Sequence, residues 1–149
     1  MDQIYLLEDD ESICELVQCT LDMHGIACKT FPTVKAFIAA LDEGVPDVVL
    51  LDIIMPKVDG LTVMERVGKD SNLKKHPAFI VVSAVGQEQI TEDAFSLGAN
   101  YYILKPFDND MLLSRIKHIR QEKEGRKKDL RKVNAYENST SYYERYLES

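Results

Sequence analysis

Short runs of consecutive apolar residues alternate along the chain with apolar residues at helical spacing. The runs predict five strands, the second of them weak, at residues 4–7, 27–31, 48–51, 79–82 and 101–104. A helical pattern follows each strand. In the first three helices the apolar positions are Ile13, Leu16, Val17 and Leu21, then Val34, Phe37, Ile38 and Leu41, and then Leu61, Met64 and Val67. The fourth helix is predicted at about residues 87–97. We expect the last helix to bury Met111, Leu112, Ile116 and Ile119.

Cap and turn residues separate these segments. Thr33 is suited to cap the second helix, and Gly25, Gly44 and Gly98 each follow the end of a helix. The main strands are apolar on consecutive residues, which is typical when helices cover both faces of a sheet. Because the connections are only a few residues long, we expect right-handed crossovers and a doubly wound α/β fold with a parallel five-stranded sheet.

Polar side chains follow the predicted strands at the points where these end. The carboxyl ends of parallel strands meet at one edge of the sheet, where functional groups collect. The residues at these ends are Glu8, Asp9, Asp10, Asp52, Ser83 and Lys105. Asp10 is either an extra acid of the site or simply the N-cap of the following helix, a position at which Asp is favoured.

Asp52 ends the most hydrophobic run of the chain, VVLLD, so its charge needs compensation. Glu8 and Asp9 would repel Asp52 if the sheet brings the three together, and a hard divalent cation would remove this repulsion. Mg²⁺ fits best, because it accepts a site of one or two carboxylates, water and a phosphate oxygen. Ca²⁺ usually needs more protein oxygens.

Ser83 and Lys105 favour a phosphoryl group on Asp52, since one supplies a hydroxyl and the other a positive charge. Asp52 is then a carboxylate nucleophile that forms an aspartyl phosphate. Taken singly, Ser83 is a small residue at a strand end and Lys105 a solvated lysine, but their joint occurrence at successive strand ends favours the site. Pro106 permits a cis or a trans peptide after Lys105, and the sequence leaves both open.

Composition and charge indicate the number of domains and the kind of binding partner. The chain has 149 residues, of which 45% are hydrophobic and 29% charged, as in one ordinary globular domain. Residues 1–119 carry 10 basic and 19 acidic residues, whereas residues 120–149 carry 8 and 6. Because the acidic body repels phosphates, we expect residues 1–120 not to bind nucleic acid directly.

Cysteine usage and hydropathy bear on location. Cys14, Cys19 and Cys28 are an odd number without metal-binding spacing, which favours a reducing compartment. The sequence contains no run of about 18 apolar residues and does not begin like a signal peptide. We therefore expect a cytoplasmic protein that does not enter a membrane.

Four motifs together resemble those of the CheY-like receiver domain of two-component response regulators. They are EDD after the first strand, VVLLD followed by MPKVDG, then VVSA, and finally YYILKPF. The resemblance covers residues 3 to about 120 and implies a flavodoxin-like (βα)5 fold with strand order 2-1-3-4-5. It implies a phosphorylation-controlled switch rather than an enzyme. Asp52 would accept phosphate from a histidine kinase or phosphotransfer protein, and Lys105 matches the lysine of the motif.

The same resemblance assigns roles to other matching residues. Glu8 and Asp9 match the acidic pair that holds Mg²⁺, with Asp9 as the direct ligand, and Ile54 matches the position that offers its backbone carbonyl to the metal. Ser83 matches the switch hydroxyl and Tyr102 the switch aromatic, although an aromatic is also favoured on any strand. The family often has two Asp residues in place of Glu8 and Asp9, so binding of Glu8 to the metal directly or through water stays open.

Two other functions compete with the switch. A magnesium-dependent phosphatase with Asp52 as nucleophile commonly has a second acid two residues later, where this chain has Ile54. A flavodoxin-like cofactor carrier needs a loop after the first strand that cradles phosphate. The loop EDDES would repel phosphate instead.

Residues 121–149 form a charged extension after the predicted domain at 1–120. The segment RQEKEGRKKDLRKV either prolongs the last helix or forms a solvated linker. Four tyrosines in the last 14 residues favour an interaction segment over disorder, one that docks on a partner or packs in a homodimer on phosphorylation. LDIIMPKVDGLTVMERV and LKKHP are similar to the receivers of sporulation master regulators, which implies transcription regulation through a partner or an output domain, or else a phosphorelay intermediate.

Overall fold

The five predicted strands form one parallel sheet in the computed structural model, which describes residues 3–73 and 75–128. The strands of this sheet are β1 (Ile4–Leu7), β2 (Cys28–Phe31), β3 (Val48–Leu51), β6 (Ala78–Ser83) and β7 (Ala99–Leu104). Their order is β2-β1-β3-β6-β7, and every neighbouring pair is parallel. Counted along the chain, this is the predicted order 2-1-3-4-5, so the flavodoxin-like α/β fold is confirmed.

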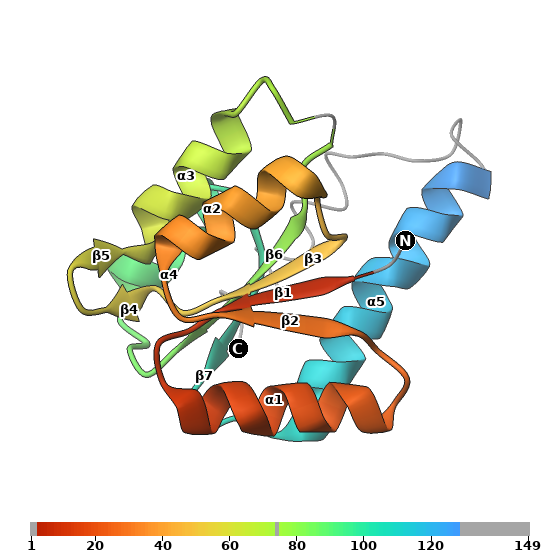
Figure 1. Cartoon of the computed structure of the whole chain (residues 1–149), viewed down its shortest axis with the longest axis horizontal. Helices are drawn as coiled ribbons and strands as arrows, with labels where there is room; N and C mark the ends of the chain where they lie inside the picture. Colours follow the sequence, from red (N-terminus) through yellow and green to blue (C-terminus); the bar gives the residue numbers. More distant parts are fainter. Residues whose placement is uncertain (1–2, 74, 129–149) are drawn as a thin grey trace.

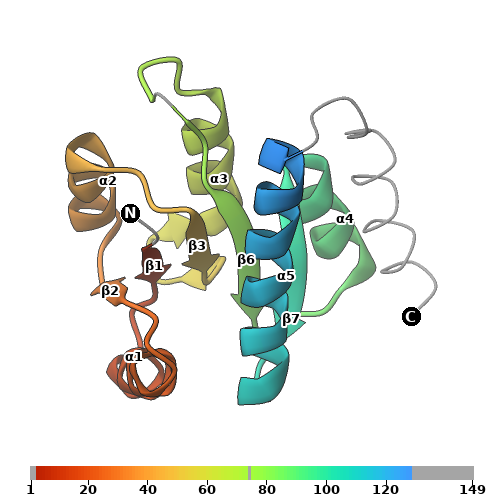
Figure 2. The ribbon, with the colours of Figure 1, turned by 90° about the vertical axis from the view of Figure 1, so that its right-hand side faces the viewer.

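Helices cover both faces of the sheet (Figures 1 and 2). On one face lie α1 (Glu11–Met23) and α5 (Asn109–Lys128), and on the other lie α2 (Val34–Glu43), α3 (Gly60–Lys69) and α4 (Glu88–Ser96). Successive strand residues point to opposite faces and so enter two separate cores. The central strands are therefore apolar at consecutive positions because each face has its own helices.

Two details of the helix faces differ from the sequence pattern. Met111 is 45% exposed and does not lie on the buried side of α5, whereas Leu113 is buried there together with Leu112, Ile116 and Ile119. Leu16 on α1 is half-exposed, and Val17 and Leu21 carry the contact with the sheet. The spacing of apolar residues indicated each helix correctly. Which residue at the edge of an apolar face is buried, however, depends on how the helix is rotated on the sheet.

The last helix continues past residue 120 and covers the described residues as far as Lys128, so the first part of the extension is helical. Arg120 donates to the Asp47 carboxylate from Nε at 2.7 Å and from Nη2 at 3.2 Å, and Lys123 Nζ donates to the Asp47 carbonyl at 2.9 Å. The tyrosines of the last 14 residues lie outside the described residues. None of the helices in residues 3–73 and 75–128 is both long and apolar enough to cross a membrane.

A small hairpin occupies the segment predicted to be a loop after Asp52. It consists of β4 (Ile54–Met55) and β5 (Val58–Asp59), which pair antiparallel. Lys57 in its turn has a φ of 67°, a left-handed conformation that Gly or Asn usually adopts. Strands of two residues are too short to produce a recognisable alternation, so the pattern gave no signal for them.

Candidate functional site

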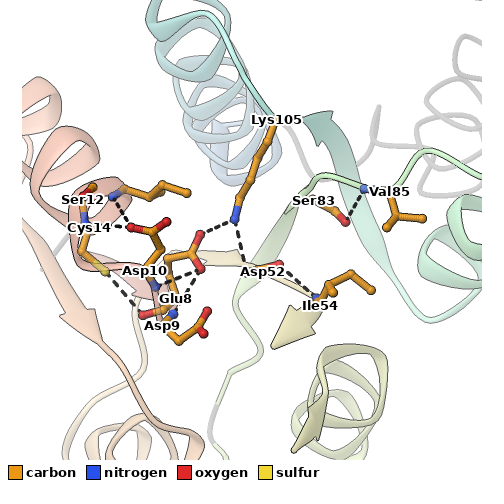
Figure 3. A network of polar contacts seen from close by, with 11 residues as sticks. Glu8, Asp9, Asp10, Ser12, Cys14, Asp52, Ile54, Ser83, Val85 and Lys105 are labelled. Carbon is orange, nitrogen blue, oxygen red and sulfur yellow. Dashed lines mark hydrogen bonds and ion pairs between the residues drawn. The ribbon is translucent and has the colours of Figure 1, made fainter. Parts of the chain in front are cut away.

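The acidic residues meet because β1 and β3 are neighbours that end at the same level. Leu7 pairs with Leu51, and the Asp52 N–H then donates to the Leu7 carbonyl at 3.1 Å. Glu8 and Asp52 therefore leave adjacent strands side by side at the carboxyl edge of the sheet (Figure 3). This edge is the predicted position of the site.

Three carboxylates form one cluster at this edge. One oxygen from each of Glu8, Asp9 and Asp52 lies within 4.8 Å of the other two. Glu8 is 1% exposed and Asp52 4% exposed, whereas Asp9 is open to solvent. Two nearly buried acids of like charge need a cation beside them.

Lys105 brings one positive charge into the cluster. The register of β6 and β7 places Lys105 after Leu104, where its N–H donates to the Ser83 carbonyl at 2.8 Å. Its Nζ forms ion pairs with a Glu8 oxygen and, at 3.2 Å, with Asp52 Oδ2 (Figure 3). The peptide between Lys105 and Pro106 is cis, one of the two forms that the sequence allowed.

The electrostatics follow from this burial. The pKa of Glu8 is raised to about 7, first by burial and then by the neighbouring Asp52 carboxylate, while Lys105 acts in the opposite direction. Burial alone would lower the pKa of Lys105, but the hydrogen bond with Glu8 and the charges of Asp52 and Glu8 outweigh burial and raise it. Three carboxylates against one ammonium group leave the cluster in need of further positive charge.

The donor set fits Mg²⁺, a hard cation that binds carboxylate oxygens and retains water. Both oxygens of Glu8 already have protein donors, because one accepts from Lys105 and the other from the backbone N–H of Asp9 at 3.1 Å and of Asp10 at 3.4 Å. Asp9 is exposed and has no such burial to overcome, which makes it the better direct ligand. Glu8 is better suited to act through water, a point that the sequence left open.

Ile54 and Asp10 have roles that differ in kind from those of the cluster. The Ile54 N–H donates to Asp52 Oδ1 at 3.0 Å, so β4 holds the Asp52 carboxylate as well as bringing the Ile54 backbone beside the cluster. Asp10 caps α1, since its carboxylate accepts from the N–H of Ser12 at 2.9 Å and of Ile13 at 3.3 Å. Among the described residues Asp10 is not a member of the acidic cluster.

Ser83 and Tyr102 converge on the backbone of Val85. Ser83 is fully buried, and its Oγ accepts from the Val85 N–H at 3.1 Å. The half-buried Tyr102 donates its hydroxyl to the Val85 carbonyl. The loop between β6 and α4 is thus held at one residue by both predicted switch side chains. Sequence reasoning did not predict this role of Val85, because a backbone contact has no residue-type signature.

The fold and the site together define a flavodoxin-like α/β domain with three carboxylates and a lysine at the carboxyl edge of its sheet. The family profile described as the response regulator receiver domain matches residues 4–117. The chain belongs to this family, and the resemblance noted in the motifs is confirmed at that level.

Solved receiver structures are similar to most of this chain. A CheY-like receiver domain protein from Methanospirillum hungatei JF-1 is 24% identical with a TM-score of 0.76, and the match covers 84% of this chain and 98% of that one. A two-component response regulator from Clostridium difficile is 20% identical with a TM-score of 0.74, covering 81% and 97%. The BeF3-activated receiver domain of DrrB is 26% identical with a TM-score of 0.71, covering 81% and 98%.

Proposed function

We propose that this receiver domain is switched by phosphorylation of Asp52 with Mg²⁺ bound at the acidic cluster. The observation that carries the proposal is the convergence of Asp52, Lys105 and two further acids at one sheet edge. The phosphate donor is a phosphohistidine of a histidine kinase or phosphotransfer protein, the partners of receiver domains. A cytoplasmic location is part of the proposal and is supported by the three cysteines, which form no disulfide in the described chain.

The geometry supports transfer to a carboxylate oxygen. An Asp52 oxygen attacks phosphorus, the P–N bond to the donor imidazole breaks, and the imidazole leaves with the bonding pair. Lys105 compensates the charge of Asp52 before transfer and that of a phosphoryl oxygen afterwards. Mg²⁺, when bound by Asp9 and Asp52 with help from Glu8 and the Ile54 carbonyl, supplies further neutralisation of the phosphoryl oxygens.

The change in shape begins at Val85. A phosphoryl oxygen on Asp52 offers Ser83 a charged acceptor for its hydroxyl, which is stronger than a neutral one. Ser83 then moves relative to the Val85 N–H, and Tyr102 follows through the Val85 carbonyl. Phosphorylation thereby shifts a two-state equilibrium of the β6–α4 loop and the neighbouring face of α4 and β7.

Acetyl phosphate tests the acceptor assignment. With Mg²⁺ it should phosphorylate the wild-type chain and leave Asp52→Asn unmodified, as measured by intact mass and phosphate-affinity gels. Asp22→Asn is the matched control, because Asp22 is an exposed aspartate on α1 outside the acidic cluster and should not affect labelling. Equal labelling of Asp52→Asn and wild type would reject the assignment.

In this function the protein is a switch and not an enzyme that turns over a substrate of its own. Position 54, where a phosphatase commonly has its second acid, holds an isoleucine whose side chain is half-exposed. We expect no turnover of small phosphate esters beyond transfer to Asp52 and loss of phosphate from it. Release of phosphate from p-nitrophenyl phosphate at many turnovers per chain would favour the phosphatase instead.

The finer role rests on motifs rather than on geometry. The segments that are similar to receivers of sporulation regulators support a role in transcription regulation through a partner or an output domain, with a phosphorelay intermediate as the alternative. Mixing the phosphorylated chain with phosphotransfer proteins of its own organism separates these roles, since an intermediate passes its phosphate to histidine and a terminal regulator retains it. Sedimentation with and without beryllofluoride tests the proposed homodimer, which identical masses would contradict.

A further inference from the structure

Gly60 lies where the hairpin after Asp52 closes onto α3. Its N–H donates to the Ile53 carbonyl at 3.1 Å, which continues the hairpin pairing of Ile54 with Asp59. Gly60 is buried and is the first residue of α3. This residue therefore contacts the backbone immediately after the phosphate acceptor.

No side chain fits at this position. A Cβ on Gly60 would lie 2.4 Å from Ile53 Cα, 2.9 Å from the Asp52 carbonyl oxygen and 3.0 Å from Ile53 Cβ. Two of these three atoms belong to the backbone and cannot rotate away. Gly60 is not among the described glycines with positive φ, so close approach and not backbone conformation requires glycine here.

The atoms that would be displaced hold the acceptor. Asp52 and Ile53 connect β3 to the hairpin, and the next residue, Ile54, donates its N–H to Asp52 Oδ1 at 3.0 Å. A shift of Ile53 away from a new Cβ would change both the path of the Asp52 backbone and the direction of the Ile54 N–H. Misplacement of a reacting group by about 1 Å reduces rates by about 10²-fold.

We infer that Gly60 is a positioning residue for phosphoryl transfer, because its missing side chain lets the base of the hairpin hold the Asp52 carboxylate in its reacting geometry. The inference rests on the proposed function of Asp52. It adds a residue that touches neither phosphate nor metal and acts through Asp52 and Ile54.

Gly60→Ala, with Gly68→Ala as its control, tests the inference. Gly68 lies in the same helix, but a Cβ there meets nothing within 4 Å. The rate of phosphorylation by acetyl phosphate in Mg²⁺ should fall by about 10- to 100-fold in Gly60→Ala and remain that of wild type in Gly68→Ala. The phosphorylation rate is measured well below the melting temperature and divided by the folded fraction, which circular dichroism gives. If Gly60 served only the stability of the fold, this rate per folded molecule would be unchanged.

The outcomes separate this inference from the proposed function. A wild-type rate in folded Gly60→Ala, with Asp52→Asn inactive, overturns the positioning role alone, whereas labelling of Asp52→Asn overturns both. Gly60→Ala is also made in the Gly68→Ala background, which should be more stable because Ala is favoured over Gly inside a helix. Failure to fold in both backgrounds would show that Gly60 serves the fold and would also overturn the inference.

Discussion

At the scale of single residues, burial determines the chemistry of the site. Glu8 is almost fully buried beside Asp52, and Lys105 is the cation that both acids contact. Folding therefore places acids where the charged form is disfavoured, and the raised pKa of Glu8 records that cost. A metal ion that binds the cluster removes the repulsion, so binding and stability are linked.

Glu8 should make the metal-free protein less stable as pH rises. Its pKa is about 7 in the folded chain against an ordinary 4.5, so the folded state binds the proton more tightly. The stabilisation of the folded state by this proton is complete below pH 4.5 and is lost as pH rises through 7. Relative to Glu8→Gln, wild type should lose at most about 3 kcal/mol between pH 4.5 and pH 8. Urea unfolding in EDTA measures this difference.

The control for this experiment is Glu15→Gln, since Glu15 is an exposed glutamate on α1. Added Mg²⁺ at pH 8 should restore stability to wild type and restore less to Glu8→Gln. A pH dependence shared equally by wild type and Glu8→Gln would show that Glu8 does not cause it.

The three thiols should differ in reactivity. Burial raises the pKa of Cys14 to about 11 and that of Cys28 to about 12, so both are protonated at pH 8, whereas Cys19 is exposed. Iodoacetamide at pH 8 should therefore modify Cys19 first, as followed by peptide mass spectrometry. Equal rates at the three positions would contradict this order.

At the scale of elements, Asp47 ties α5 to the sheet. It immediately precedes β3, is 6% exposed, and donates its N–H to the Gln3 carbonyl while its own carbonyl accepts from the Ala78 N–H. The Arg120 guanidinium and the Lys123 ammonium both reach this residue. The part of α5 around Arg120 and Lys123 is therefore fixed against the starts of three strands, at the edge opposite the acidic cluster.

Asp47 and Arg120 should be energetically coupled. The Asp47 carboxylate is nearly buried and Arg120 binds it with two nitrogens, so a double-mutant cycle with Asp47→Ala and Arg120→Ala should give about 1–3 kcal/mol in urea unfolding. The cycle for Glu65 and Lys69, an exposed pair on α3, should give about 0.5 kcal/mol or less. Equal couplings for the two pairs would refute the role of burial.

At the scale of the whole molecule, the sheet separates two cores and two edges. One core contains α1 and α5 and the other contains α2, α3 and α4. The acidic cluster occupies the carboxyl edge, and the contact between Asp47 and α5 occupies the opposite edge. The parallel strands β6 and β7 run between these two edges.

Truncation should show how far the folded unit extends. A chain that ends at Lys128 keeps Arg120 and Lys123 and, together with the full chain, serves as the reference for the unfolding free energy. A chain that ends at Lys117, the limit of the family match, loses the buried Ile119 as well as both contacts with Asp47 and should be less stable by about 3 kcal/mol or more. Urea unfolding of the three chains measures this, and equal stability of the Lys117 chain would contradict it.

The sequence by itself determined the five strands of the sheet, the five helices, the fold class and the residue types of the site, but not the β4–β5 hairpin. Short apolar runs that alternate with helical patterns indicate strands covered on both faces, and short connections then favour a parallel doubly wound sheet. The edge at which Asp52, Ser83 and Lys105 meet follows from that topology. The caps at Asp10 and Thr33 were also predictable, because capping depends on residues three or fewer positions away.

Only the tertiary structure decided which atoms meet. The engagement of both Glu8 oxygens, the double hold on Val85 and the contact of Arg120 with Asp47 join residues up to 97 positions apart. The exposure of Met111 depends on the rotation of α5 over the sheet, and the need for glycine at position 60 depends on the approach of another backbone segment. Such distances are set by packing of the whole chain, and local patterns carry no information about them.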